Sequence, residues 1–245
     1  MPERTVLTIG GADRVAFLQG LITNDVDRAR DGLVYAALLT PQGKFLADFF
    51  LHDTGDAILL DTAAETAAAL TQRLAMYRLR ADVSISDSGL NVSRGTGPMP
   101  EGALADPRHP ALGWRLYGEA SGDDGTDWDA IRVKHTIPEA GIELLPNDTF
   151  VLEAGFERLH GVDFKKGCYV GQEVTARMKH KTDLKKGFAT VSIDGDAPAG
   201  TPILRDGKPA GTLFTRSGGQ AIAYLRFDRA TGPMTAGDAS VSYAA

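Results

Sequence analysis

KGCYVGQE, residues 166–173, contains the only cysteine of the chain. Glycines bracket the thiol at positions 167 and 171, and glycine is used where the backbone turns tightly or approaches a ligand. The next residues, QEVTARM (172–178), predict a short helix with Val174 and Met178 on one face. Cys168 is therefore expected in a loop just before a helix N-terminus.

The surroundings of this cysteine favour a reactive thiolate. Lys165 and Lys166 precede it, and both ammonium groups and a helix N-terminus stabilise negative charge on sulfur. The alternative is that Cys168 is a small buried hydrophobe, as most free cysteines are. The two flanking glycines and the two lysines favour the functional interpretation.

Composition restricts the class of protein. With 245 residues the chain can form one large domain or two to three small ones. A single cysteine excludes an intrachain disulfide, which favours a reducing, cytoplasmic setting. The sequence shows neither a signal-length apolar segment at its start nor a run of 18 apolar residues. We therefore expect neither export nor a membrane span.

Charge is unevenly distributed. The net charge of −6 argues against a protein that coats nucleic acid, so direct nucleic-acid binding is not expected. Residues 165–186, however, contain seven Lys/Arg against two acids, a formal charge of +5 that leaves −11 for the rest. This basic segment is either a site for an anionic ligand or a solvated face of lysines.

Hydrophobic patterns predict an α+β protein that ends in a small β-barrel or sandwich. Residues 33–40 and 45–52 are strand-like runs joined by the turn PQGK (41–44), a hairpin signal. A long Ala/Leu helix through about Tyr77 is expected to be capped by Asp61 or Thr62. Glycine and proline are dense from Ser88 to Pro110, which predicts irregular structure.

Short β-runs separated by glycine and aspartate turns fill the last 60 or so residues, a pattern typical of a barrel or sandwich. We therefore expect an α+β region over 1–183 and a small β-barrel over 184–245. Within the first region the pattern predicts two subdomains, about 1–87 and 88–183, whose segments can interleave.

Several kinds of site are excluded by the residues present. There is no phosphate-binding glycine loop, and the five histidines lack zinc spacing, so no intrinsic metal is predicted. An iron–sulfur cluster normally needs four protein ligands, commonly thiolates. This chain can therefore contact a cluster only transiently, across a dimer or together with a partner.

Two glutamates are candidates for binding a heterocycle. Glu139 and Glu153 each precede an Ala-Gly pair in apolar surroundings. A partly buried carboxylate needs hydrogen-bond donors, and the 2-amino-N3 edge of a pterin offers two in a fork. The alternative for each is a salt-bridged surface glutamate.

The cysteine stretch closely resembles the signature of the YgfZ family, folate-binding relatives of the glycine-cleavage aminomethyltransferase that assist iron–sulfur proteins. FLQGLITNDV (17–26) and PQGK (41–44) look like the N-terminal folate-binding half of that superfamily. PEAG (138–141) and LEAG (152–155) look like its pterin-side glutamate segments. The resemblance covers most of residues 5–180 and implies a GcvT-like arrangement of three modules around a tetrahydrofolate pocket.

The resemblance also implies residue roles. Cys168 is the reactive centre at the rim of the pocket, Lys166 and Tyr169 tune or shield it, and Gln172 with Glu173 anchors the loop. The residues implied for the reactive site are Cys168, Lys166, Tyr169, Gln172, Glu173 and Arg177, and those implied for folate contact are Asn24, Asp48, Glu139 and Glu153. The basic segment 165–186 faces the folate tail or an anionic partner.

Three functions remain open. The resemblance favours a folate-dependent factor, more an assembly protein than a turnover enzyme, that matures or repairs iron–sulfur enzymes, including those that thiolate tRNA. Its implied partners are folate and iron–sulfur enzymes or scaffold proteins. The second function is a one-carbon transferase, although this chain has Ala47-Asp48 where aminomethyltransferases typically carry two aspartates. The third is a tRNA- or protein-binding module with a structural cysteine.

Overall fold

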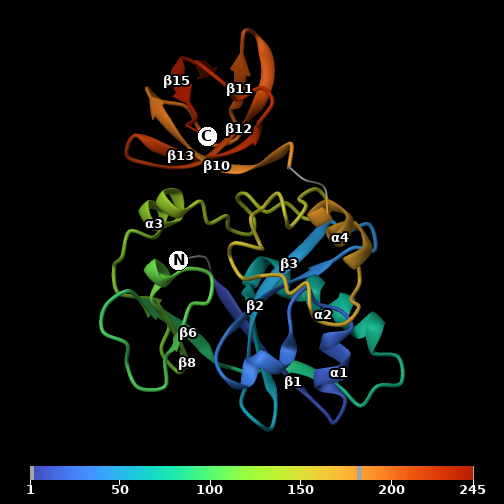
Figure 1. Cartoon of the computed structure of the whole chain (residues 1–245). Helices are drawn as coiled ribbons and strands as arrows, with labels where there is room; N and C mark the ends of the chain where they lie inside the picture. The colour runs from blue at the N-terminus through green and yellow to red at the C-terminus, as the bar shows by residue number, and fades with distance from the viewer. Residues whose placement is uncertain (1–2, 181–183, 245) are drawn as a thin grey trace. The chain divides into compact units, whose positions relative to one another are not determined.

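The computed structural model describes residues 3–180 and 184–244, and the boundary predicted at 183/184 falls beside the residues left undescribed. The chain forms two compact units whose segments alternate along the sequence (Figure 1). The first unit comprises Met1–Thr126, Pro146–Val151 and Phe156–Ala176, and the second comprises Asp127–Leu145, Leu152–Gly155 and Arg177–Ala245. No helix in the described part of the chain is long and apolar enough to cross a membrane.

A five-stranded sheet with the order β2-β3-β4-β1-β5 is the centre of the first unit, and all its neighbouring strands are antiparallel. Its strands are β1 (Arg4–Gly10), β2 (Val34–Leu39), β3 (Phe45–Asp53), β4 (Ile58–Ala63) and β5 (Ser84–Asp87). The hairpin predicted around PQGK is confirmed as β2 and β3. Both strands are almost wholly buried, which explains their nearly continuous apolar sequences.

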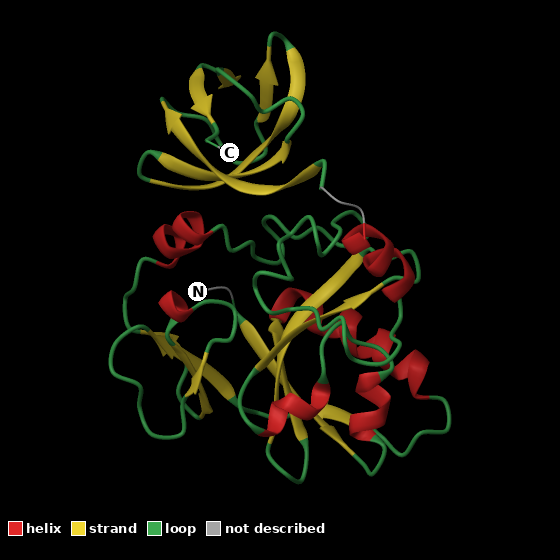
Figure 2. Cartoon of the chain, viewed as in Figure 1, coloured by secondary structure: helices red, strands yellow, loops and turns green. Residues whose placement is uncertain are grey.

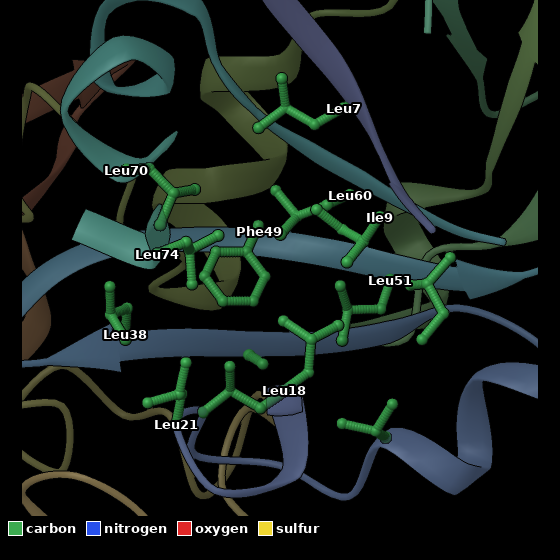
Figure 3. Close-up of a cluster of buried hydrophobic side chains, with 14 of the residues drawn as sticks. Leu7, Ile9, Leu18, Leu21, Leu38, Phe49, Leu51, Leu60, Leu70 and Leu74 are labelled. Carbon is green, nitrogen blue, oxygen red and sulfur yellow. The ribbon is translucent and has the colours of Figure 1, made fainter. Parts of the chain in front are cut away.

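Helices and the sheet share one apolar core. The helical elements that pack near this sheet include α1 (Arg14–Gln19), the 3-10 helix η1 (Val26–Arg30), α2 (Ala64–Arg78) and the start of α4 (Gln172–His180). Leu18 of α1 and Leu70 and Leu74 of α2 gather around Phe49 of the sheet (Figure 3). Each such side chain, fully buried, contributes roughly 1.5–3 kcal/mol.

The predicted cap of the long helix is wrong. Strand β4 continues through Asp61 and Thr62 to Ala63, and α2 begins at Ala64 without a side-chain cap. Asp61 is not available as a cap because its carboxylate binds Arg4 at 2.6 Å and Arg115 at 2.9 Å. Ion pairs with residues distant in sequence therefore place Asp61 in a strand, although its local sequence predicts the start of a helix.

The prediction of irregular structure over Ser88–Pro110 holds only in part, because β6 (Asn91–Gly95) and β7 (Leu104–Ala105) are strands. This region contributes to a second sheet, separate from the first in Figure 2. Its strand order is β7-β8-β6-β9, and β6 and β9 are parallel. Its strands are β6 (Asn91–Gly95), β7 (Leu104–Ala105), β8 (Trp114–Gly118) and β9 (Gly122–Asp123), with a short 3-10 helix, η2 (Pro110–Leu112), before β8. A Cβ at Gly113, where φ is +62°, would lie 2.0 Å from the Gly95 carbonyl oxygen. Glycine here permits close strand approach.

The second unit holds helix α3 (Trp128–His135), which Asp127 caps by accepting a hydrogen bond from the Ala130 N–H, and a closed barrel. The barrel order is β10-β13-β12-β11-β14-β15. Its strands are β10 (Lys186–Asp194), β11 (Pro202–Arg205), β12 (Lys208–Ser217), β13 (Gln220–Arg226), β14 (Met234–Ala236) and β15 (Ala239–Ser242). Buried and exposed residues alternate along β10, as expected for a barrel wall. The predicted α+β class with a C-terminal barrel is confirmed.

Candidate functional site

Cys168 lies on the surface, in the loop that precedes α4, and its thiol is free. The next residue, Tyr169, is only 7% exposed. Val170 packs against the core cluster of the first unit. The cysteine is therefore presented to solvent by a loop whose following residues are anchored in the protein.

Lys166 points away from solvent into a group of backbone carbonyls. Its Nζ donates hydrogen bonds to the oxygens of Gln19 (2.8 Å), Ile22 (2.7 Å) and Asn24 (2.9 Å). Burial lowers the pKa of Lys166 to about 8, while the charges of Asp25 and Asp163 act in the opposite direction. At pH 7 the side chain is therefore still an ammonium group with three donors.

Tyr169 belongs to the same packed corner. Its ring centre lies 5.2 Å from the Lys166 Nζ. Burial raises its pKa, and a hydrogen bond with Thr175 partly offsets the rise. Tyr169 is thus a buried, neutral anchor of the loop. Its predicted role of shielding the thiol stays a prediction.

The end of the cysteine loop next to α4 is held by close contacts at two glycines, Gly171 and Gly43. Gly171 has φ +83°, and a Cβ there would lie 2.6 Å from the Thr40 carbonyl oxygen. Gly43, in the PQGK turn, has φ +75°, and a Cβ there would lie 2.8 Å from Val174 Cβ. Two motifs that are distant in sequence therefore meet through backbone, and the lack of side chains at both glycines permits it.

Other predicted residues of the reactive site lie on α4. Gln172 begins this helix, and its N–H donates to the Tyr169 carbonyl at 3.2 Å. Glu173 lies in the first turn and Arg177 in the last. Glu173 and Arg177 both have interaction partners. The predicted basic segment 165–186 is described only in part, since residues 181–183 lie outside the described ranges.

Asn24 and Asp48, the folate-contact candidates in the first unit, are both buried. Both N–H groups of the Asn24 amide are used within the protein, by the carbonyls of Tyr35 and His160, each at 2.7 Å. Asp48 accepts the Tyr35 hydroxyl at 2.8 Å. Burial and the charge of Asp48 raise the pKa of Tyr35 well above its usual value, so the phenol stays protonated as a donor.

Sequence reasoning missed a buried charge network in the first unit. Three guanidinium groups surround the Phe50 ring, those of Arg4, Arg108 and Arg115, at 5.8, 4.8 and 3.9 Å from its centroid. Asp61 and Asp106 pair with them. The available signal was that Asp61 directly follows the apolar run ILL (58–60) and can therefore continue a strand as well as cap a helix. A charge inside a strand rarely occurs without a partner.

Asp106 should make the first unit acid-sensitive. Burial raises its pKa, but Arg108 and Arg115 outweigh the burial and lower the pKa to about 2 from 3.8. Because the folded-state pKa lies below the unfolded-state value, this contribution to stability is present above about pH 4 and lost as pH falls towards 2. The contribution at neutral pH is about 2 kcal/mol.

Urea unfolding of wild type and Arg108→Met between pH 5 and 2.5 measures this contribution. We expect the difference in unfolding free energy between the two proteins to shrink as the pH falls, because Asp106 of the unfolded chain becomes protonated over this range and the advantage of its ionised, Arg108-paired form in the folded wild type decreases. Stability curves that stay parallel over this range would contradict the assignment.

The two pterin-side candidates belong to the second unit, and Asn24, Asp48 and Cys168 belong to the first. Glu139 forms an ion pair with Arg132 at 3.2 Å. Glu153 accepts the Tyr224 hydroxyl at 2.5 Å through Oε2. Its Oε1 accepts no hydrogen bond from any residue that the structure describes. Of the two, Glu153 is the better fit for a ligand that brings its own donors.

A buried glutamate that sequence reasoning overlooked, Glu143, organises the second unit. It is 1% exposed, pairs with Arg132 and accepts the Glu139 N–H at 2.9 Å. Its other oxygen accepts the Thr215 hydroxyl at 2.5 Å. The available signal was a lone acid in the apolar run GIELL (141–145). Within residues 3–180 and 184–244, no group of three or more His, Cys, Asp or Glu side chains could hold a metal ion.

Comparisons with known proteins address fold and family. The family model for the C-terminal beta-barrel domain of CAF17 matches residues 185–245. The crystal structure of glycine cleavage system aminomethyltransferase T from Bartonella henselae superimposes with a TM-score of 0.77 at 13% identity, covering 98% of this chain and 82% of that one. At that identity the likeness concerns the fold alone, and it confirms the predicted GcvT-like class.

Relatives in sequence are named as mitochondrial iron–sulfur cluster assembly factors. The IBA57 homolog of Mycosarcoma maydis is 32% identical over 82% of this chain, which spans 58% of that protein. IBA57 of Mus musculus is 28% identical over 94% of this chain and 78% of its own length. IBA57 of Homo sapiens is 30% identical with the same two coverages.

These relatives correct the predicted cellular location and make the predicted family more specific. The predicted cytoplasmic location is contradicted, since all three relatives are named as mitochondrial. The prediction rested on the single cysteine, which indicates a reducing compartment. Cysteine content cannot distinguish one reducing compartment from another. The relatives carry the name IBA57 rather than YgfZ. This chain is 30% identical to the human protein over 94% of the chain and 78% of the human protein. It therefore belongs to the family of the iron–sulfur cluster assembly factor IBA57.

Proposed function

We propose that this protein binds tetrahydrofolate or a related folate and assists the assembly or repair of iron–sulfur enzymes, tRNA-modifying ones included, through the thiol of Cys168. The observation that carries the proposal is the exposed thiol on a loop fixed before it by Lys166 and after it by Tyr169. Membership in the IBA57 family supports the iron–sulfur part.

Thiolate sulfur suits this role because it is a soft ligand that binds iron of iron–sulfur clusters. The chain has one cysteine, so the remaining ligands of a cluster must come from a partner. The cluster is in this view cargo that Cys168 contacts during transfer or repair. Iron–sulfur enzymes or scaffold proteins are the partners that supply the other ligands.

Folate binding is supported by the carboxylate of Glu153. The Tyr224 hydroxyl occupies Oε2 and holds the group in place, while Oε1 keeps its capacity to accept. A pterin ring presents two adjacent N–H donors that a carboxylate can accept. Glu139 is a weaker candidate, because Arg132 already neutralises it.

Cys168→Ser tests the proposal. In cells that lack the gene, we expect this variant to restore less than about a tenth of the iron–sulfur enzyme activity that the wild type restores, because an alcohol is a poor iron ligand. The thermal midpoint of the purified protein should not change, since the side chain is exposed. Folate affinity, measured by calorimetry, should also be retained.

Comparison with the variant Asp48→Asn distinguishes an iron–sulfur assembly factor from a one-carbon transferase. If the protein were instead a one-carbon transferase, Asp48→Asn would abolish activity and Cys168→Ser would have a modest effect. Full restoration of iron–sulfur enzymes by Cys168→Ser would contradict the proposed role of the thiol. An unchanged folate affinity in Glu153→Gln would contradict the proposed pterin contact.

A further inference from the structure

We propose that Lys166 is a positioning residue, whose ammonium group, held by three backbone carbonyls, fixes the loop that presents Cys168. This inference rests on the proposed function, since it concerns the same thiol. It differs from the role implied by sequence, in which Lys166 acts on the thiol by its charge.

All three N–H donors of the Lys166 ammonium group form hydrogen bonds. Three carbonyl oxygens lie at 2.7–2.9 Å, and an ammonium group has three N–H donors. One acceptor belongs to Gln19, the last residue of α1, whose carbonyl has no partner within its own helix. The other two belong to Ile22 and Asn24, so one side chain joins the turn after α1 to the cysteine loop.

Because all three donors are engaged, none is left for the sulfur. The positive charge is further balanced by Asp25 and Asp163, the two acids whose charges act on it. Asp163 also accepts the backbone N–H groups of Lys165 and Lys166, at 2.6 and 3.1 Å. The segment before the cysteine is therefore fixed by a local turn and by the lysine side chain.

Only two residues, Gly167 and Cys168, separate this anchor from Tyr169, and both are exposed. A span this short between two fixed points has few conformations, so the direction of the thiol follows from its anchors. Gly167 has no Cβ and by itself would leave the span mobile. The lysine anchor compensates for that mobility.

Three substitutions distinguish positioning from charge tuning. Lys166→Met keeps the length of the side chain and removes both charge and donors. Lys166→Arg keeps the charge, but a planar guanidinium cannot direct three donors at three converging carbonyls. Lys165→Met removes a neighbouring exposed charge and leaves the carbonyl contacts intact.

Amide hydrogen exchange of peptides spanning 164–169 in the purified protein is the readout. We expect Lys166→Met and Lys166→Arg each to accelerate exchange of the backbone amides at positions 165 and 166, which donate to Asp163, about tenfold, and Lys165→Met to leave it within about twofold of wild type. Restoration of iron–sulfur enzymes in cells should fall with Lys166→Arg as it does with Lys166→Met.

Wild-type exchange in Lys166→Met, or wild-type behaviour of Lys166→Arg in both measurements, would overturn the inference. Exchange of strands β2 and β3 in the same samples reports whether the first unit, which contains Lys166, is folded. If Lys166→Met proves unfolded, Lys166→Gln replaces it, because its amide retains two donors, and the same exchange criterion applies. The Cys168→Ser test is independent: the thiol can be essential while Lys166 has no positioning role, and each result is read separately.

Discussion

Arg115→Met is expected to lower the free energy of unfolding of the first unit by about 3–5 kcal/mol. The guanidinium binds Asp61 at 2.9 Å and Asp106 at 3.3 Å, and all three side chains are at most 4% exposed. Removing it leaves two buried carboxylates with one cation fewer. It also removes the cation packed 3.9 Å from the centre of the Phe50 ring.

Urea unfolding, with amide exchange of β3 and β8 to follow the first unit separately from the barrel, measures this loss. Arg30→Met is the control, because it removes a guanidinium that is 63% exposed from its ion pairs with Asp27 and Asp53 in the same unit. We expect a loss of less than about 1 kcal/mol. The double variant Asp61→Asn/Arg115→Met should recover part of the loss because it restores charge balance. A loss below about 1 kcal/mol for Arg115→Met would show that the network is not needed for stability.

Gly171→Ala is expected to destabilise the protein by about 2–3 kcal/mol and to displace the cysteine loop. Its new methyl group would lie 2.6 Å from the Thr40 carbonyl oxygen and 3.1 Å from Gly43 Cα, and alanine at φ +83° is itself strained. Backbone atoms cannot yield to this methyl group as a flexible side chain could.

Gly167→Ala is the matched control within the same motif, because a Cβ at position 167 meets no atom within 4 Å. Its effect on the unfolding free energy should stay within about 0.5 kcal/mol. Thermal and urea unfolding compare the two variants directly. Equal stability of Gly171→Ala and Gly167→Ala would mean that the contact between the two motifs is not maintained in solution.

Local sequence determined the elements whose cause is local. The PQGK hairpin follows from turn chemistry between two apolar runs. The β-rich C-terminal domain follows from short β-runs divided by glycine turns, although that pattern fits a sandwich as well as a barrel. The loop position of Cys168 follows from two glycines before a helical pattern. In each of these features, the residues that decide the conformation are neighbours in the chain, so the pattern can be recognised without a partner.

Only the tertiary structure decided the features that depend on distant partners. Asp61 has the pattern of a helix cap, but Arg115, 54 residues away, holds it inside a strand. Lys166 has the pattern of a thiol neighbour, but Gln19, 147 residues away, takes one of its donors. A buried charge is stable only where partners compensate its desolvation, and folding selects those partners from the whole chain. The sequence therefore predicted that Cys168 lies in a loop before a helix, while the fold alone established how that loop is held.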